Sequence, residues 1–558
     1  MNVIQWLRAH SYVSILFVVG VFFILIYSWF YYGVDAHFTS PDETANYYFT
    51  ELFSDSGRLR YQEPLHEIGA GLIRPRSTVM VGEYVAPGSF LGLMVLYGVI
   101  AKIFGSGIIL LLTPIISVVG VLFFYKLIKE IFTNRIAFIS ALLLFILPPF
   151  WYYSSRGMFH NILFIVLFII GLYYLTRIFT ASLQKLSVRL HIVFSGLFIG
   201  LALFVRTSEI SWILPLLIIL VFFLRKKVGW SKSILFVAVV VFIVGGFLLI
   251  NQSVYESIMA SGYSTSSIDT SSVQTTTTSF LNTVTKLIFP FGVDFQKIGS
   301  AAYHYLLIMF PWFSALLIVG LVTVLKRNIG RLPNSISAWI PNTENTNPRQ
   351  RLYLMLYVLC GSWLVIYYGS FSFIEHFNRS EIILGSSYLR YWLPIFVFGL
   401  PLCVTAILCL SNLIKKPVIR SSIITIFIGI FVLLSCNVTM LDPLQGLVQL
   451  KKHNITAQSK STLIDQITEK DAVIIAGHSD KVFFSTRKVM AVAPSEVARG
   501  CFVIKSLLSD NIPLYYVYNP LDSTAEDTLE IFNNYEIGMS EMHQFIESNE
   551  VLYKLNLR

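Results

Sequence analysis

Residues 12–32 read YVSILFVVGVFFILIYSWFYY, a run without one charged side chain. A helix needs about 20 predominantly apolar residues to cross the hydrocarbon core of a bilayer. The run is too long for the core of a signal peptide, and no small-residue cleavage site follows it. It therefore predicts a retained membrane-spanning helix. The polar segment HFTSPDETANYYF, at 37–49, comes directly after this helix and carries the adjacent carboxylates Asp42 and Glu43.

The composition of the whole chain has the same character. Of its 558 residues, 55% are hydrophobic and 13% are charged, and the mean hydropathy is +0.69. Because a soluble domain usually carries about 25% charged residues, this composition excludes a soluble enzyme and a disordered chain. The net charge of +10 does not predict a nucleic-acid partner, because cytoplasmic loops of membrane proteins collect Lys and Arg. The five cysteines show neither a disulfide framework nor a zinc-binding spacing.

Ten further apolar runs predict membrane spans, near 107–125, 136–151, 161–177, 191–205, 209–224, 233–250, 303–325, 352–372, 388–410 and 421–438. The run 87–104 is a twelfth candidate, and the positive-inside rule decides against it. Without it, and with the N-terminus inside, the cytoplasmic connections are the basic segments 126–135, 177–189, 225–232, 326–351 and 415–420. We therefore predict a multi-pass plasma-membrane protein with eleven spans, a cytoplasmic N-terminus and an extracytoplasmic C-terminus. Residues 87–104 then form a juxtamembrane or re-entrant helix on the outer surface.

The topology divides the chain into two predicted parts. Residues 1–440 form a transmembrane module, whose first outer loop, 33–106, carries juxtamembrane helices. Residues 441–558 have ordinary soluble composition, with strand-like runs at 471–477, 512–519 and 550–556 and helical patterns at 494–511 and around 527–532. This alternation predicts a small extracytoplasmic α/β domain. The Ser/Thr-rich stretch 261–278 predicts a flexible outer loop.

The segment after the first span has the signals of a helix start. Ser40 suits the N-cap, Pro41 the first helical position, Glu43 the third position of a capping box, and Gly57 the stop. Asp42 and Glu43 would then sit in the first turn only because the helix dipole favours anions there. Two carboxylates beside a membrane surface are nevertheless costly unless they are hydrated or used. A functional role therefore remains open beside the structural one.

Further motifs follow in order: GEYVAPG at 82–88, leading into an apolar helix that ends in KIFG at 102–105; Ser155-Arg156 after Pro148-Pro149; GLALFVRTSEISWILP at 200–215; and YLRYWLP at 388–394. Their order resembles the GT-C superfamily of polyprenyl-phosphate-sugar glycosyltransferases, in the manner of protein O-mannosyltransferases and lipid A aminoarabinose transferases. The resemblance covers roughly residues 10–440. It departs from many relatives at GMFHN, 157–161, where an Asp is missing after the second-loop Arg. The Trp-Trp-Asp motif of oligosaccharyltransferases is also missing from the sequence.

The resemblance implies a polytopic α-helical GT-C-like fold and an inverting transfer of a sugar at the extracytoplasmic face. The donor would be a polyprenyl-phosphate-linked sugar and the acceptor a protein, glycan or lipid. It implies catalytic roles for Asp42, as base, and Glu43. Acceptor or sugar binding falls to Glu83, Arg156 and His160, and lipid-phosphate binding to Arg206, Arg390 and Tyr391, with Arg156 as a further phosphate candidate. A divalent metal is possible but is not expected to be essential, because Asn161 stands where relatives often have Asp.

Several of these residues, and the charged segment 373–381, also have an interpretation that is purely structural. Arg206 suits an interfacial side chain that reaches to the membrane surface, and Arg390 suits an aromatic-belt anchor. His160 suits a structural histidine, and the charged segment 373–381 suits a solvated loop. The spans hold almost no ionisable residues, which disfavours a proton-driven transporter. The alternative function is a non-catalytic glycolipid carrier or transporter.

The eleven-span topology is testable by labelling. A cysteine placed at Ser106 should react with an impermeant thiol reagent added to intact cells, because the topology puts this residue outside. A cysteine at Asn328, in a predicted cytoplasmic connection, should react only after permeabilisation. Equal labelling of both positions from outside would overturn the predicted topology.

Overall fold

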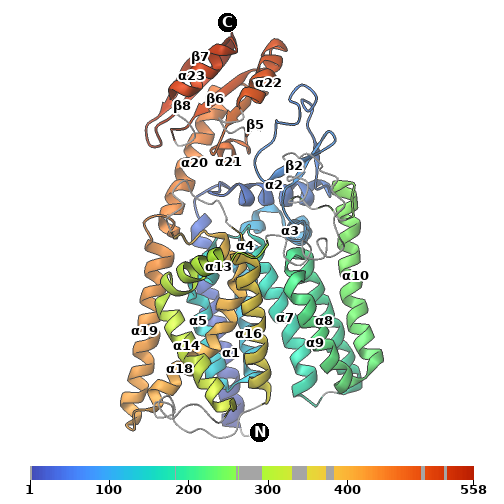
Figure 1. Ribbon diagram of the computed structural model, residues 1–558, viewed down its shortest axis with the longest axis vertical. Coiled ribbons are helices and arrows are strands. Elements are labelled where there is room, and N and C mark those ends of the chain that lie inside the picture. The colour runs from blue at the N-terminus through green and yellow to red at the C-terminus, as the bar shows by residue number, and fades with distance from the viewer. Residues whose placement is uncertain are drawn as a thin grey trace.

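The computed structural model describes residues 3–182, 184–258, 260, 262, 292–329, 348–371, 382–491, 497–520 and 525–558. A bundle of long helices carries a smaller domain of strands and helices at one end, which we call the outer end (Figure 1). The N-terminus lies at the opposite end of the bundle. The predicted loop 261–278, except for Gly262, and the charged segment 373–381 lie outside the described residues.

Nine helices of the described chain are long and apolar enough to cross a membrane. They include α1 (Val3–Ser28), α4 (Ile109–Ile131), α7 (His160–Thr180), α8 (Lys185–Val205), α9 (Ile210–Val228), α10 (Trp230–Tyr255), α16 (Pro348–Gly369), α18 (Leu393–Asn412) and α19 (Pro417–Leu441). Two bent pairs pass the same test. The first is α5 (Asn134–Ile146) with α6 (Pro148–Ser155), and the second is α13 (Phe295–Ala302), continued by the π-helix η5 (Tyr303–Ile308), with α14 (Pro311–Ile329). With each bent pair taken as one span, the described chain has eleven, the number predicted.

Proline explains both bends. The second helix of each pair begins at a proline, Pro148 or Pro311, and the two bends measure 51° and 98°. A proline ring removes a backbone donor and clashes with the preceding turn, so a helix breaks there. The first bend leaves α6 only eight residues long, with Arg156 as its C-cap. The bend therefore sets where α6 ends, and with it the backbone position of Arg156.

The first outer loop begins with the predicted helix, α2 (Pro41–Ser56). Ser40 is its extended N-cap, and Gly57 ends it in the left-handed region at φ +72°. The predicted capping box is wrong, because the Ser40 side chain makes no capping bond and Glu43 bonds to Arg156 instead. Glu43 binds Arg156 rather than the start of the helix, because a buried arginine requires a counter-charge.

The rest of the first outer loop forms a small antiparallel sheet and a short helix. The sheet has the order β1 (Tyr61–Gln62), β3 (Tyr84–Pro87), β2 (Thr78–Val81). Residues 84–87 pair with β2, so the helix predicted over 87–104 begins later, as α3 (Gly92–Phe104). A helix of this length spans only about 20 Å. This agrees with its exclusion from the spans.

The C-terminal domain contains the predicted α/β elements. The predicted strands are β4 (Val473–Ala476), β6 (Leu514–Tyr518) and β8 (Glu550–Leu557), and the predicted helices are α22 (Val497–Ser509) and α23 (Ala525–Asn534). The sequence reading missed α20 (Leu447–Ile467), α21 (Asp480–Phe483), β5 (Lys488–Met490) and β7 (Ile537–Phe545). The sheet order is β5-β4-β6-β8-β7, parallel up to β6 and antiparallel beyond it. Alternate residues of β4 enter cores on the two faces of this sheet, which explains its unbroken apolar run.

One glycine permits the close approach that positions the outer ends of the helices. A Cβ atom at Gly92, the first residue of α3, would overlap the carbonyl of Phe204 and the Cα of Val205 at the end of α8. These backbone atoms directly precede Arg206. A side chain at position 92 would therefore push α3 away from the segment that carries this arginine.

We expect Gly92→Ala to destabilise the fold by about 1–3 kcal/mol, the usual cost of overpacking. Thermal unfolding in one detergent preparation measures the change. Gly245→Ala is the control, because a Cβ at Gly245 in α10 meets no atom within 4 Å. Parental stability of Gly92→Ala would show that the backbone can move apart at no cost.

Candidate active site

Three ion pairs lie together at the outer end of the bundle. Glu43 pairs with Arg156, Arg206 with Glu209 at 2.7 Å, and Arg390 with Asp42 at 3.3 Å. Asp42 and Glu43 are neighbours in α2, and the Arg206 guanidinium lies 4.7 Å from the ring centroid of Tyr391. The structure thus brings together residues from α2, from the turns after α6 and α8, and from α17 (Ser387–Tyr391).

Asp42 is the most accessible carboxylate of the three. Its side chain is 29% exposed, whereas those of Glu43 and Glu209 are 1% exposed. Its Oδ1 accepts a hydrogen bond of 2.6 Å from the Ser77 hydroxyl, and its Oδ2 faces Arg390. Asp42 is therefore the carboxylate that a substrate can reach.

The Glu43–Arg156 pair is buried and fully engaged. Tyr31 donates to Glu43 Oε1 at 3.2 Å, and two nitrogens of Arg156 donate to Oε2. Arg156 also donates to the hydroxyls of Tyr152 at 2.9 Å and Thr39 at 3.1 Å. Such a pair is stable in the interior only when its remaining polar atoms are satisfied, as they are here. Its geometry joins α2 to the end of α6, beneath Asp42.

Arg206 points into the protein. Its side chain is 4% exposed, and its partner Glu209 accepts further bonds from Tyr368 at 3.0 Å and Trp212 at 2.5 Å. An arginine that merely reached for the membrane surface would be exposed. Arg206 is instead a cation held in a dry, aromatic setting close to Tyr391.

Arg390 and Tyr391 lie beside Arg206 in the same cluster. The Arg390 guanidinium lies 4.8 Å from the ring centroid of Phe159, and the Tyr391 ring stacks on Tyr368 at 4.5 Å. The Asn161 amide donates to the backbone carbonyl of Arg390 at 2.9 Å. Asn161, in the stretch where the resemblance led us to expect an acid, thus holds the backbone of Arg390 in place.

His160 lies in the same cluster, but its ring is bound to the backbone. Its Nε2 lies 2.7 Å from the carbonyl of Phe90, and Asp42, Arg206 and Arg390 are close enough to act on it electrostatically. A hydrogen bond to a carbonyl requires a donating Nε2–H, which fixes the tautomer. This arrangement suits a residue that ties α7 to the segment before α3.

Glu83 is the one predicted site residue that the structure sets apart. It lies in the turn between β2 and β3, where its carboxylate accepts a bond of 2.8 Å from Gln62. Ser77, which touches Asp42, is at the other end of the same hairpin. Within the described residues, Glu83 makes no hydrogen bond or ion pair with the ion-pair cluster, so the geometry gives its predicted acceptor role no support.

The sequence analysis missed several residues of the cluster. Glu209 lies in the quoted stretch 200–215, where an acid three residues after an arginine in an apolar setting is a usable signal. Ser77 gave no signal of its own. Lys481 comes from α21 in the C-terminal domain and is close enough to Glu43 and Arg156 for their charges to act on its ammonium group. Burial, together with the nearby Arg76 charge, lowers the pKa of Lys481 to about 8.

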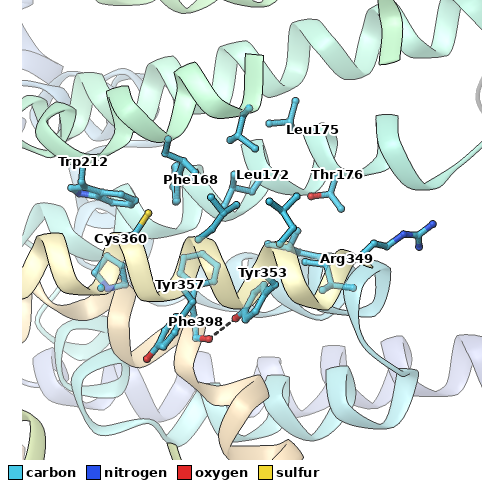
Figure 2. A pocket seen from close by; sticks show the side chains of 18 of the residues that line it. Phe168, Leu172, Leu175, Thr176, Trp212, Arg349, Tyr353, Tyr357, Cys360 and Phe398 are labelled. Carbon is cyan, nitrogen blue, oxygen red and sulfur yellow. Dashed lines mark hydrogen bonds between the residues drawn. The ribbon is translucent and has the colours of Figure 1, made fainter. Parts of the chain in front are cut away.

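An apolar cavity of about 260 Å³ lies among α4, α7, α9, α16 and α18. It extends between Trp212 and Arg349, with Phe168, Leu172, Tyr353 and Tyr357 along its walls (Figure 2). Trp212 is also a hydrogen-bond partner of Glu209. One end of the cavity therefore adjoins the Arg206–Glu209 pair.

The described residues do not fit a divalent cation. They contain no group of three His, Cys, Asp or Glu side chains placed to hold a metal ion. Each of the three carboxylates in the cluster already faces an arginine. Neither Asp42 nor Glu43 is therefore assigned a metal-binding role.

Comparisons with known proteins agree with this architecture. A family model described as dolichyl-phosphate-mannose-protein mannosyltransferase matches residues 92–249. No curated protein matches the sequence significantly. Among solved structures, ArnT from Cupriavidus metallidurans bound to undecaprenyl phosphate has a TM-score of 0.60 at 11% identity over 98% of both chains.

A second solved structure has the same fold. The Archaeoglobus fulgidus oligosaccharyltransferase, tethered with an acceptor peptide, has a TM-score of 0.55 at 13% identity, over 98% of this chain and 74% of that one. Identities this low establish the fold and leave the chemistry to the site. The family model and the solved structures agree with the predicted resemblance to the GT-C superfamily of polyprenyl-phosphate-sugar glycosyltransferases, and the chain has the fold that these solved structures share.

Proposed function

We propose that this protein transfers a hexosyl or pentosyl unit from a polyprenyl phosphate to a protein, glycan or lipid acceptor. The observation that carries the proposal is the Asp42–Arg390 pair, a solvent-accessible carboxylate beside a cation, with Arg206 nearby and an apolar cavity below. The predicted topology places this site on the extracytoplasmic side and the N-terminus in the cytoplasm. The structural neighbour ArnT is itself described as bound to undecaprenyl phosphate.

The proposed reaction is a single displacement. Asp42 takes the proton from an acceptor hydroxyl or amine, and the freed electron pair attacks the anomeric carbon. The bond from that carbon to the phosphate oxygen breaks on the opposite face, so the configuration inverts. The electron pair leaves with the lipid phosphate. Charge thus builds on the phosphate, where Arg390 and Arg206 stabilise it.

The apolar cavity gives the donor lipid a place beside these cations. Its wall is aromatic and aliphatic, and Trp212 links its outer end to Glu209 and thereby to Arg206. A donor with its phosphate at Arg206 would place its first isoprene units in the cavity. A volume of about 260 Å³ holds only part of a polyprenyl chain, and the remainder would lie in the bilayer.

The buried Glu43–Arg156 pair has a different role in the proposed reaction. Glu43 has both oxygens engaged and is 1% exposed, so we assign it to positioning rather than to proton transfer. Arg156, equally engaged, holds Glu43 and the start of α2 in place. We assign the donor phosphate to the two other arginines, because Arg390 is partly exposed and Arg206 adjoins the apolar cavity through Glu209 and Trp212.

Asp42→Asn should abolish transfer, with a loss of at least about a hundredfold, because the amide cannot accept the acceptor's proton. The partly exposed Asp42–Arg390 pair contributes about 0–1 kcal/mol, so stability should hold.

Glu43→Gln should instead lower stability by about 3–5 kcal/mol, because it leaves Arg156 buried without its counter-charge. Single-turnover transfer from a panel of polyprenyl-phosphate sugars and thermal unfolding of each variant separate the two roles. Parental turnover in Asp42→Asn would exclude it as the base, and donor binding without transfer by the parent would favour a carrier.

Arg390→Gln should weaken donor binding by about tenfold to a hundredfold. A charge-assisted hydrogen bond contributes roughly 1.5–3 kcal/mol, and each 1.4 kcal/mol changes Kd about tenfold. Turnover should fall too, because the leaving phosphate gains charge in the transition state. For Arg206 the matched variant is Arg206→Gln with Glu209→Gln, which leaves no unpaired charge. Arg177→Gln is the control, because Arg177 pairs with Glu130 away from the cluster. Parental donor affinity in the Arg390 and Arg206 variants would make these arginines structural.

A further inference from the structure

The C-terminal domain and the first outer loop share one hydrophobic core. Ile73 of the loop is buried in the cluster that contains Val473 and Ile475 of β4, and Leu65, Ile68 and Leu72 pack against the same cluster. The backbone amide of Ala491 also donates to the carbonyl of Arg74 at 3.3 Å. The segment that precedes β2 is therefore part of the C-terminal domain's packing as well as of the outer loop.

At the end of this segment, Asp480 binds both the backbone and the side chain of Arg76. The carboxylate, which is completely buried, accepts bonds from the Arg76 amide at 2.7 Å, from Nε at 2.9 Å and from Nη2 at 2.7 Å. Arg76 Nη2 also donates to the carbonyl of His478 at 2.8 Å. A side-chain ion pair alone would leave the backbone free to move. The additional amide bond fixes the backbone at residue 76.

The next residue, Ser77, contacts Asp42. Ser77 has a φ of +59°, in the left-handed region that non-glycine residues rarely adopt. It is held there from the other side by the Gly88 amide, which donates to the Ser77 carbonyl at 2.8 Å. A Cβ at Gly88 would lie 2.6 Å from that carbonyl, so glycine is required for the approach. Strained residues of this kind persist only where the surroundings impose them, often at functional sites.

We propose that the C-terminal domain positions the base, with Asp480 fixing Arg76 so that the Ser77 hydroxyl orients the Asp42 carboxylate. The inference rests on the proposed function. Asp480, Arg76 and Ser77 are positioning residues, since only Asp42 meets the acceptor. The domain is thereby a part of the transferase site, which Asp480 reaches through two consecutive residues of the outer loop.

The docking of α21 agrees with this arrangement. The ring of Phe484, directly after α21, lies 4.7 Å from that of Tyr48 in α2, so the two helices pack side by side at the outer end. Figure 1 shows α21 at the face of the C-terminal domain that is turned toward α2. A second ion pair, from Lys488 to Glu63 at 2.5 Å, joins the same domain to the same loop without touching Ser77. This pair supplies a matched control.

The first experiment removes the Ser77 hydroxyl without straining the backbone. Ser77→Gly accepts the positive φ but cannot donate to Asp42, so kcat should fall about tenfold while the KM for donor changes less than about twofold. Ser77→Asn also tolerates positive φ and restores a donor, so it should recover part of the lost kcat. Parental kcat in Ser77→Gly would overturn the proposal. An equal fall of kcat in Ser77→Gly and Ser77→Asn would overturn it as well.

The second experiment tests whether Asp480 acts through Ser77. Asp480→Asn should lower kcat by a factor similar to that of Ser77→Gly, and the double variant should be no worse than either single change, because coupled residues are not additive. Lys488→Gln, which breaks the other ion pair, should leave kcat unchanged. If Lys488→Gln and Asp480→Asn lower kcat equally, or if the effects of Asp480→Asn and Ser77→Gly multiply, the domain acts by docking alone.

A readout independent of transfer separates this proposal from the proposed function. Hydrogen exchange of the full-length protein in nanodiscs should speed up at 39–45 and 74–80 in Asp480→Asn, and in Lys488→Gln it should stay parental at 39–45. Unchanged exchange at 39–45 in Asp480→Asn overturns the positioning proposal, whatever the activity. A parent protein inactive with every donor, but with the expected exchange pattern, overturns the proposed function and leaves the coupling of the domain to Asp42 supported.

Discussion

The buried ion pair between Glu43 and Arg156 is the interaction on which the outer end of the molecule depends. An arginine in an apolar interior requires a counter-charge and partners for its remaining N–H groups, since the desolvation of an unpaired charge costs several kcal/mol. Here the counter-charge comes from the first turn of α2, and the partners are Tyr152 and Thr39. The pair therefore fixes the position of α2 relative to α6. Asp42 is the residue before Glu43, so its place in the site follows.

The fold was predictable because its signals are local. Each span is an apolar run of the length that a bilayer requires, and the alternation of basic loops separates the spans from the short helix at 92–104. The strands β4 and β6 could be found because both faces of these parallel strands are covered, which makes their runs continuously apolar. By contrast, β5 has three residues, and β7 carries an irregularity between Glu541 and His543, so neither shows a clean period.

The candidate site was predictable where motifs carry charge in an apolar setting. Asp42, Arg156, Arg206 and Arg390 all meet in the structure, because a charge near the membrane needs either a partner or a function. The sequence alone could not distinguish Glu83 from these residues. The hairpin that holds Glu83 away from Asp42 has only four residues in each strand, which is too short to show a clear strand pattern.

Other parts of the site had no local signal. Asp480 lies about four hundred residues beyond Arg76 and joins it only after two separate segments have folded together. The φ of Ser77 depends on that same contact and on Gly88, and a serine at such a position looks ordinary in a sequence. Positioning residues of this kind are long-range by nature, whereas spans and capping signals depend on neighbours in the chain.

The three ion pairs differ in burial, and this difference divides their work. Two of them have side chains that are at most 6% exposed, whereas Arg390 and Asp42 are 15% and 29% exposed. Opening a buried pair would leave an uncompensated charge in a low dielectric, which a substrate cannot offset with one new contact. Opening the partly exposed pair costs less, because water reaches both partners as they part. An anionic phosphate arriving at Arg390 therefore competes with Asp42 for the same guanidinium. When the phosphate displaces Asp42, the carboxylate becomes free to face the acceptor. On this argument, donor binding at Arg390 and the freeing of the base are one event. The two buried pairs stay closed, and Arg206 acts on the phosphate as a cation that Glu209 already holds in place.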